Sequence, residues 1–549
     1  MRTDSRLIAG LVLVAAIVAA LPASAKRYSH RTTFLLARSY DGHFPDAPAR
    51  DGAISHDQRV ARYMAFDSDA TTLVQRDTNG LTDVFLVRRK PPWGENGTPW
   101  VPGSTEIVSL APNGTAANGR SYNPAVDGDS HHRPHCVAFI SEASNLVPGD
   151  TNGKADAFVR DMRTGRTTRV SVSSSGAQSD GTTYEVAIDG ACERVAFASD
   201  ASNLALTHTS RRNWKAAVTN RPRPGIRQVY VRILGGQGYN AGFKGLTLLA
   251  SASRAGHAAS GNSYDLSLAR SGKAVAFTSE ATNLDRGDLN ARPDVYLRTL
   301  TRKFVHLGHG RGMQTLRLNT RLVSADAARR SGNGASSHAS VNDTGRYVAY
   351  QTDASDLLDR DHNGTTDVVR ADMSTSPPTQ RWISRSAFSG TGNGPSRLPA
   401  ISDAGQFVLF ESDATNFRPS AAVRPDTNGV TDVFLWNGRT GNVSLESRDS
   451  QNHYLPAPSG APVTSSRGNY VLFEGGNPRK PKPVEPPPPP PQQGPFDPII
   501  CIVNPQAGQC QVKKREPPPP DNEPQGTEPS SPAPSAAIPQ LFVRYLGPQ

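Results

Sequence analysis

The chain repeats one short phrase seven times, and this repeat constrains the fold more than any other feature. A typical copy is the apolar run VAFASDASNL at 195–204, which has an aromatic residue near its start. Consecutive copies are separated by 58 to 80 residues, a period too long for a helical-hairpin solenoid. The aromatic residues of the seven copies are Phe66, Phe139, Phe197, Phe277, Tyr350, Phe410 and Phe473.

Each period contains four short segments that are predicted to be strands. In the second period they are SYNPAV (121–126), CVAFISEA (136–143), DAFVRDM (156–162) and TTRVSVS (167–173). Four short antiparallel strands per repeat are typical of a propeller blade. The central runs are apolar on consecutive residues, which indicates a sheet covered on both faces. A β-sandwich is the competing all-β fold, but it gives no reason to repeat one four-strand unit seven times.

These repeats resemble a known family. The phrase D-G-x-x-V-A-F-x-S, followed by D-V-F/Y-V/L-R-D and T-x-R-V-S, is similar to the TolB-like group of bacterial β-propeller repeats, distant relatives of the tryptophan-aspartate repeats. The resemblance is carried by GRYVAY (345–350), VAFAS (195–199) and DAFVRD (156–161), and it covers residues 32–475 and 540–546. It implies a β-propeller fold and a binding or scaffolding role.

The two ends of the repeat region indicate how the ring closes. The seventh copy continues with the expected third strand, QLFVRY, only at 540–545, and its fourth strand is missing. The segment RTTFLLARS at 31–39 matches the fourth-strand phrase. We therefore predict that the N-terminal strand completes the last blade, so that no long edge strand remains. Seven blades are expected over 26–477 and 540–549, with six or eight as alternatives.

Residues 478–539 are predicted to be a disordered insert that projects from the last blade. The segment contains six consecutive prolines at 486–491 and four at 517–520. Such sequences favour an extended polyproline conformation without a packed core.

The N-terminal residues 1–25 are predicted to be a cleaved signal peptide. Arg2 and Arg6 precede an apolar run that ends at ASA (23–25), the small-x-small pattern of a signal-peptidase site. The alternative is a membrane anchor, but the apolar run is short for a spanning helix. We expect the protein to be exported to the periplasm, the cell surface or the medium, without a membrane span after cleavage.

Export to an oxidising compartment predicts disulfide bonds between the four cysteines. Cys136 and Cys192 take equivalent places beside the second strands of adjacent repeats, and we expect them to bridge two blades. The alternative is a pair of free buried thiols. Cys501 and Cys510 lie in the proline-rich insert and are predicted to form a local disulfide.

The charge of the chain bears on its partners. Lysine and arginine number 60 against 49 acidic residues, which gives a formal net charge of +11. This balance suits an anionic surface or polymer, although a scattered basic surface is also explained by solubility alone. No nucleic-acid-binding motif is present. We expect an envelope or extracellular protein or an anionic polymer as partner, no nucleic acid, and a monomer.

An acidic turn, D-x-N-G-x-x-D, follows the repeated phrase in several periods. Hard oxygen ligands two residues apart, a glycine and a further acid resemble the middle of an EF-hand calcium loop. The bidentate glutamate of that loop is absent, and a structural Asx-type turn explains the same residues. Calcium binding is therefore predicted beside this alternative. The candidate ligands are Asp77, Asn79, Asp83, Asp150, Asn152, Asp156, Asp288, Asn290, Asp294, Asp359, Asp361, Asn363, Asp367, Asp426, Asn428 and Asp432.

Two further groups of polar residues are interpreted as structural. The segment HHRPH at 131–135 precedes a strand and favours a turn over a metal site. An acid recurs in the Ser-Asp/Glu-Ala phrase and is predicted to cap backbone amides after the second strand. The six acids of this phrase are Asp69, Glu142, Asp200, Glu280, Asp353 and Asp413.

No catalytic residue is assigned from the sequence. It contains no distinctive nucleophile elbow, phosphate-binding loop, zinc signature or paired catalytic carboxylates. We therefore expect an exported binding or scaffold module of the cell envelope or extracellular space. The alternative is an extracellular hydrolase or lyase that acts on carbohydrate or peptide at the mouth of the propeller.

Overall fold

The computed structural model describes residues 31–57, 60–91, 98–205, 218, 220–235, 243–308, 311–359, 361–386, 390–417, 426–475 and 539–547. The predicted signal peptide, Cys501, Cys510 and the proline-rich insert up to residue 538 lie outside these residues. Within the described ranges, no helix has the length and apolar character needed to cross a bilayer.

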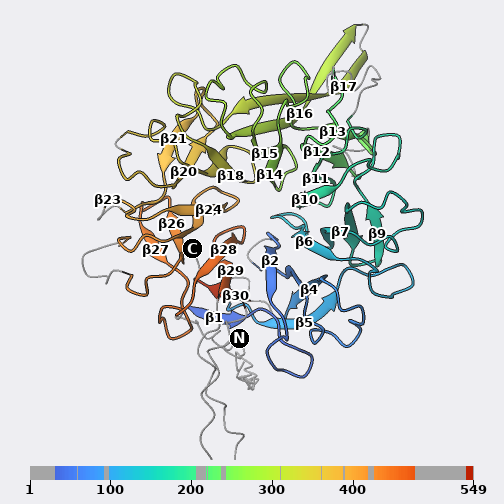
Figure 1. Ribbon diagram of the computed structural model, residues 1–549, viewed down its shortest axis with the longest axis vertical. Helices are drawn as coiled ribbons and strands as arrows, with labels where there is room; N and C mark the ends of the chain where they lie inside the picture. The colour runs from blue at the N-terminus through green and yellow to red at the C-terminus, as the bar shows by residue number, and fades with distance from the viewer. Residues whose placement is uncertain are drawn as a thin grey trace, which may run out of the picture.

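Seven four-stranded antiparallel sheets surround a common axis (Figure 1). This is the seven-bladed propeller that the repeat predicts. Blades are numbered 1 to 7 by their innermost strands, in chain order. The innermost strands are β2 (Ala49–Ile54), β6 (Ser121–Val126), β10 (Thr183–Ile188), β14 (Ser263–Leu268), β18 (Ser336–Val341), β24 (Ser396–Ile401) and β28 (Ser459–Thr464). The second strands are β3 (Tyr63–Ser68), β7 (Cys136–Ser141), β11 (Arg194–Ser199), β15 (Ala274–Ser279), β19 (Tyr347–Thr352), β25 (Phe407–Ser412) and β29 (Tyr470–Gly475).

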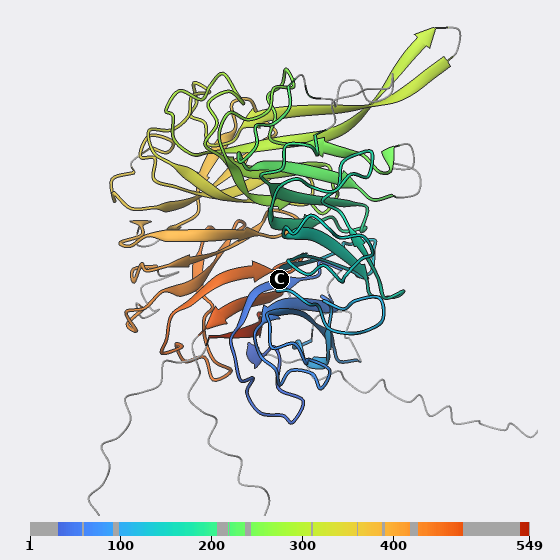
Figure 2. The ribbon, with the colours of Figure 1, turned by 45° about the vertical axis from the view of Figure 1, so that its right-hand side comes forward.

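The outer half of each blade is formed by its third and fourth strands. The third strands are β4 (Asp83–Arg89), β8 (Asp156–Asp161), β12 (Gln228–Ile233), β16 (Asp294–Gly308), β20 (Asp367–Asp372), β26 (Asp432–Asn437) and β30 (Gln540–Tyr545). The fourth strands are β5 (Pro102–Ile107), β9 (Arg166–Arg169), β13 (Thr247–Leu249), β17 (Arg311–Leu322), β21 (Thr379–Trp382), β27 (Val443–Leu445) and β1 (Thr32–Leu35). The β16–β17 hairpin projects beyond the ring (Figure 2), and β22 (Arg385–Ser386) pairs with β23 (Gly390–Thr391).

The N-terminal strand closes the ring, as predicted. The last blade has the strand order β28, β29, β30, β1. Phe34 of β1 lies opposite Val543 of β30, and the Leu36 amide continues the pairing by donating to the Leu541 carbonyl at 2.9 Å. The outermost strand of blade 7 therefore comes from the opposite end of the chain.

The core lies between the blades, which explains the consecutive apolar residues of the repeated phrase. Every residue of β7, β11 and β15 is buried. Ala65 and Leu86 of blade 1 pack with Val137 and Phe139 of blade 2. The repeated aromatic residue is fully buried in each blade, and in six blades it contacts an aromatic residue of the third strand. Phe66 and Phe85, for example, stack with ring centroids 5.6 Å apart.

Cys136 and Cys192 form the predicted disulfide between blades 2 and 3. Their Cα atoms are 6.1 Å apart, and 56 residues separate them in the sequence. Cys136 begins β7, and Cys192 lies in the turn between β10 and β11. The bond therefore ties two neighbouring blades together at the turns that precede their second strands.

Replacing Cys136 and Cys192 together by alanine should lower the free energy of unfolding. A cross-link that closes a loop of this length is expected to stabilise the native state by about 4 kcal/mol, through the entropy of the unfolded chain. Denaturant unfolding of both proteins measures the difference. Thiol labelling of the unfolded, unreduced chain is the companion test, because reaction of Cys136 and Cys192 would show that no bond had formed.

A buried ion pair lies where blade 6 meets the closing strands of blade 7. The side chains of Arg544 and Glu446 are both fully buried, with 3.4 Å between Nε and Oε2. Arg31, just before β1, contacts both Glu446 carboxylate oxygens at 2.9 Å. Arg544 also donates to the carbonyls of Arg448 and Asp449. One carboxylate thus holds an arginine from each end of the described chain.

Glu446→Gln should destabilise the protein by about 3 kcal/mol, because removing one partner of a buried pair leaves an uncompensated charge. The matched control is Glu106→Gln, since Glu106 pairs with Arg88 on the surface, where both side chains are more than one third exposed. That exposed pair is expected to contribute less than about 1 kcal/mol. Equal losses in the two variants, measured by denaturant unfolding, would contradict the role of Glu446 in ring closure.

Candidate functional site

The predicted acidic turns join the second and third strands of blades 1, 2, 4, 5 and 6. In blade 1, the Asn79 side-chain oxygen accepts the Leu81 amide at 2.9 Å, and its nitrogen donates to Asp83 at 2.7 Å and to the Ala117 carbonyl at 3.0 Å. This is an Asx turn. The turn recurs at Asn152, Asn290, Asn363 and Asn428.

The last aspartate of each acidic turn begins the third strand and is buried. In blade 1, Asp83 accepts a hydrogen bond from the hydroxyl of Ser109, which in turn accepts the Val84 amide. Burial raises the pKa of Asp83 to about 6, and it raises the pKa of Asp294 to about 8. The equivalent serine–aspartate pairs are Ser171–Asp156, Ser324–Asp294, Ser384–Asp367 and Ser447–Asp432.

The first aspartate of the turn has a different environment in each blade. Asp150 of blade 2 forms an ion pair with Arg169, and Asp288 of blade 4 accepts a hydrogen bond from the Tyr296 hydroxyl at 2.6 Å. Among the described residues, the carboxylate oxygens of Asp77 in blade 1 have no hydrogen-bond partner. Asp359, the additional candidate in blade 5, is exposed. Metal binding by these residues stays a prediction.

The acids of the Ser-Asp/Glu-Ala phrase were expected to cap the turn that follows the second strand, but among the contacts of the described residues none caps that turn. Among these contacts, Asp200 alone accepts a backbone amide, that of Thr182 before β10, at 2.6 Å. The serine before the acid caps the turn instead: Ser68 accepts the Ala70 amide at 3.0 Å. The acid reaches neighbouring side chains, as Asp69 does with Thr82 and Arg50. A serine hydroxyl is short enough to fold back onto the amide two residues ahead.

The HHRPH segment lies in the connection between β6 and β7, and its last histidine contacts a buried aspartate. His135 Nδ1 lies 2.9 Å from Asp127 Oδ2, and this contact raises the pKa of His135. Asp127, His135, Cys136 and Cys192 are near enough together to resemble a metal-binding group. The two sulfur atoms are bonded to each other, so they cannot serve as thiolate ligands in the oxidised protein.

Three tyrosines recur on the innermost strands, and the sequence pattern did not single them out. Tyr122, Tyr184 and Tyr264 take the same position on the innermost strands of three successive blades and are partly exposed. They lie at the face of the acidic turns, because Tyr184 donates to Asp200, in the turn after β11, at 3.0 Å. The guanidinium of Arg227 stacks 3.8 Å from the Tyr184 ring centroid.

A β-bulge interrupts the innermost strand next to these positions. It leaves a backbone amide without a partner in its own sheet, and a carboxylate of the neighbouring blade accepts this amide. The Asp51 amide donates to Glu474 of blade 7 at 3.0 Å, and the Ala461 amide donates to Glu411 of blade 6 at 3.2 Å. Ala461 has a φ of 46°, which is costly for a residue with a Cβ. These carboxylates therefore bind the blades to one another.

Asp67 departs from this pattern. It holds the position of Glu474 and Glu411 in its own second strand, but its side chain is one methylene shorter and Oδ1 has no hydrogen-bond partner. It is 3% exposed. Burial, and then the nearby Asp51 carboxylate, raise the pKa of Asp67 to about 8. Burial and the Asp51 carboxylate thus favour the protonated form of Asp67 in the folded protein.

The other end of the channel is crossed by side chains. Arg270, in the turn after β14, donates to the Val126 carbonyl of blade 2 at 2.7 Å and to the Ile54 carbonyl of blade 1 at 3.5 Å. His56 of blade 1 contacts Asp403 of blade 6 at 2.5 Å. These contacts join blades that are far apart in the sequence, across the face opposite the acidic turns.

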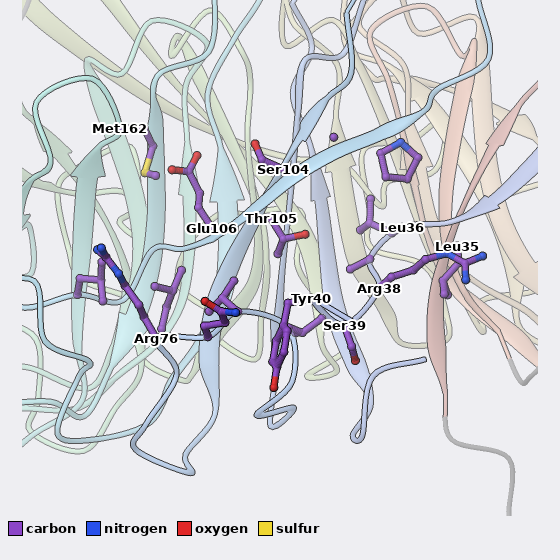
Figure 3. A pocket seen from close by; sticks show the side chains of 18 of the residues that line it. Leu35, Leu36, Arg38, Ser39, Tyr40, Arg76, Ser104, Thr105, Glu106 and Met162 are labelled. Carbon is purple, nitrogen blue, oxygen red and sulfur yellow. The ribbon is translucent and has the colours of Figure 1, made fainter. Parts of the chain in front are cut away.

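A separate pocket of about 840 Å³ lies on the outer wall of the ring, where the chain leaves β1 and passes β5 (Figure 3). Tyr40, Arg76 and Glu106 are among its lining residues (Figure 3). Tyr40 is 60% exposed. The pocket contains none of the residues predicted from the sequence to bind a metal.

No protein-family profile and no curated protein matches the sequence. Among solved structures, the chain is similar to a protein assigned as TolB from Agrobacterium tumefaciens, at 12% identity over 62% of this chain and 83% of that chain, with a TM-score of 0.31. An oligogalacturonate lyase from Vibrio parahaemolyticus has 10% identity over 81% and 93% of the two chains, with a TM-score of 0.39. A puromycin-hydrolyzing peptidase from Mycobacterium tuberculosis has 10% identity over 78% and 49%, with a TM-score of 0.40. These likenesses concern architecture, and the propeller fold that the TolB-like repeats implied is confirmed by the strand order.

Asp67→Asn should stabilise the protein increasingly as the pH rises from about 4 to about 8. Because the pKa of Asp67 is raised in the folded protein, the protonated group adds to the free energy of unfolding below the pKa of an unfolded aspartate. The parent protein loses this stabilisation as the pH rises to about 8, and asparagine, which does not titrate, does not. Denaturant unfolding at several pH values measures the difference between variant and parent.

Asp69→Asn is the control for that experiment. Although burial opposes it, hydrogen bonds from Thr82 and Arg50 hold the pKa of Asp69 below its usual value. Removing this carboxylate should therefore bring no gain at high pH. A flat pH dependence for Asp67→Asn would contradict the interpretation of Asp67 as a buried, protonated group.

Proposed function

We propose that the protein is an exported binding module that holds a segment of an envelope or extracellular protein at the channel mouth on the acidic-turn face. The row of Tyr122, Tyr184 and Tyr264 carries this proposal. Tyrosine combines a large apolar ring with a polar hydroxyl and is enriched, with arginine, at the energetic centres of protein interfaces. Arg227 stacks on the middle ring, which keeps that ring in a fixed orientation.

The charge of the mouth favours a protein partner over the anionic polymer that net charge suggested. Asp51, Glu185 and Asp265 lie next to the tyrosine and arginine positions on the innermost strands and are at least partly exposed. Arg50, Arg227 and Arg397 lie among them and pair with Asp69, Glu185 and Glu411. The mouth therefore carries charges of both signs, which suits a protein segment better than a polymer of one charge. The disulfide between Cys136 and Cys192 supports export, because such bonds persist in oxidising compartments.

The test is capture of a partner from an envelope extract by the purified full chain. Replacing Tyr122, Tyr184 and Tyr264 by alanine should abolish capture, while Tyr40→Ala, a change of an exposed tyrosine on the outer wall, should leave it intact. Far-UV and near-UV circular dichroism verify that the triple variant is folded. Capture that survives the triple variant, or is lost equally with Tyr40→Ala, would overturn the proposal.

An extracellular hydrolase or lyase is the second candidate, and Asp67 is the observation that favours it. A buried carboxyl group with a pKa of about 8, beside the exposed Asp51, combines a proton donor with a carboxylate in one channel. Turnover of a panel of polysaccharides and peptides tests this candidate. Activity that disappears in Asp67→Asn, while the fold is retained, would replace the binding proposal with an enzymatic one.

A further inference from the structure

The acidic turn of blade 1 contains a buried carboxyl group that forms no ion pair among the described residues. Burial raises the pKa of Asp77, and the nearby Asn79 backbone amide offsets only part of this effect. Asp77 is 9% exposed, and neither of its carboxylate oxygens has a hydrogen-bond partner among the described residues. Its charge adds to the effect of burial in raising the pKa of the nearby Asp83. Buried carboxylates are ordinarily paired with a cationic side chain or bound to a metal ion.

Blade 2 shows where positive charge belongs in this turn. Arg169 Nη1 lies 2.8 Å from Asp150 Oδ1 and 3.3 Å from Asp156 Oδ2. Asp150 and Asp156 correspond to Asp77 and Asp83 of blade 1. A single guanidinium nitrogen therefore contacts both carboxylates of the turn, so the two groups converge on one position.

The other blades do not supply this arginine. Arg169 lies opposite Phe158, the third residue of its third strand. The equivalent residue of blade 1 is Ile107, which lies opposite Phe85. An apolar side chain also takes this place in blades 4, 5 and 6, at Leu322, Trp382 and Leu445.

Blade 3 shows that the fold does not require the negative charge. Its third strand begins with Gln228 in place of the aspartate, and this neutral side chain accepts a hydrogen bond from Ser251 at 2.7 Å and donates to the Ala259 carbonyl at 3.1 Å. In blade 1 two residues make the equivalent interactions: Asp83 accepts from Ser109, and Asn79 donates to the Ala117 carbonyl. The aspartates of the acidic turn thus add charge that the hydrogen bonds of a blade do not need.

We propose that the acidic turn of blade 1 is a binding site for a divalent cation of the calcium class, held by the carboxylates of Asp77 and Asp83 at the position that Arg169 fills in blade 2. Calcium prefers carboxylate oxygens and completes its shell with water. Asn79 orients Asp83 and is not a ligand, because its side chain is used in the Asx turn. This site is independent of the proposed channel function.

The turns of blades 5 and 6 contain the same pair of aspartates, Asp361 with Asp367 and Asp426 with Asp432, although Asp426 Oδ1 accepts the Asn428 amide at 3.2 Å. We expect these turns to bind the same cation. Burial, with the charge of Asp426 as a further cause, raises the pKa of Asp432 to about 7. Blade 4 is an intermediate case, since Tyr296 donates to Asp288, yet Asp288 Oδ1 and Asp294 Oδ2 have no hydrogen-bond partner. Blade 2 is expected to bind no cation.

The experiment counts bound calcium on the purified full chain after chelator treatment, by equilibrium dialysis with radioactive calcium. With few protein ligands per site, dissociation constants of about 0.1 to 1 mM are expected, the range of extracellular calcium modules. Millimolar calcium should also raise the melting temperature, because a ligand that binds the native state stabilises it. Magnesium at the same concentration is the control for cation class.

Two reciprocal variants test the position of the site. Ile107→Arg places a guanidinium in blade 1 where blade 2 has one, and it should remove one calcium site. Arg169→Leu removes the guanidinium of blade 2 and should add one calcium site, a gain that misfolding cannot imitate. Asp77→Asn should remove one site while leaving the melting temperature in chelator unchanged or raised.

The proposal fails if the full chain binds no calcium at millimolar concentration, or if calcium stoichiometry is the same in the parent, Ile107→Arg and Arg169→Leu proteins. In either case the paired carboxylates would be compensated by a shared proton. Equal binding of magnesium would overturn the assignment to the calcium class.

Discussion

The N-terminal strand β1 pairs with β30, and this pairing converts seven consecutive sheets into one closed ring. Without it, blade 7 would present β30 as an unpaired edge, and blade 6 would lose the carboxylate contact to Arg31. Glu446 is fully buried between Arg31 and Arg544, which come from opposite ends of the described chain. Closure therefore covers the outer edge of the terminal blade with a strand from the other end of the described chain.

The interfaces between blades use charged side chains in a regular manner. An arginine in the third strand donates to loop carbonyls of the preceding blade, as Arg232 does with Ser173 and Arg298 does with Ala252. Nearer the axis, a carboxylate such as Glu474 accepts the freed amide of a bulge in the next blade. Many ionisable groups at these interfaces are therefore structural, and the three tyrosines and Asp67 lie outside this pattern.

The acidic turns combine a structural role with a charge that exceeds it. The Asx turn and the serine–aspartate hydrogen bond shape the link between second and third strands, and Gln228 performs the same task without a charge. The comparison among blades within one chain is informative because the backbone is nearly the same each time. The first aspartate of the turn has three different surroundings. It pairs with an arginine in blade 2, accepts a hydrogen bond from a tyrosine in blade 4, and forms no ion pair among the described residues in blade 1.

The sequence by itself determined the number of blades, the strands of each blade, the closing role of β1 and the disulfide between Cys136 and Cys192. These features follow from patterns that recur at equivalent positions in the seven repeats, so comparing the repeats of a single sequence is enough to find them. The tertiary structure alone decided what each polar group contacts. Ser68 rather than Asp69 caps its turn, and Arg169 reaches two carboxylates. These contacts depend on side-chain positions in space that sequence spacing does not encode.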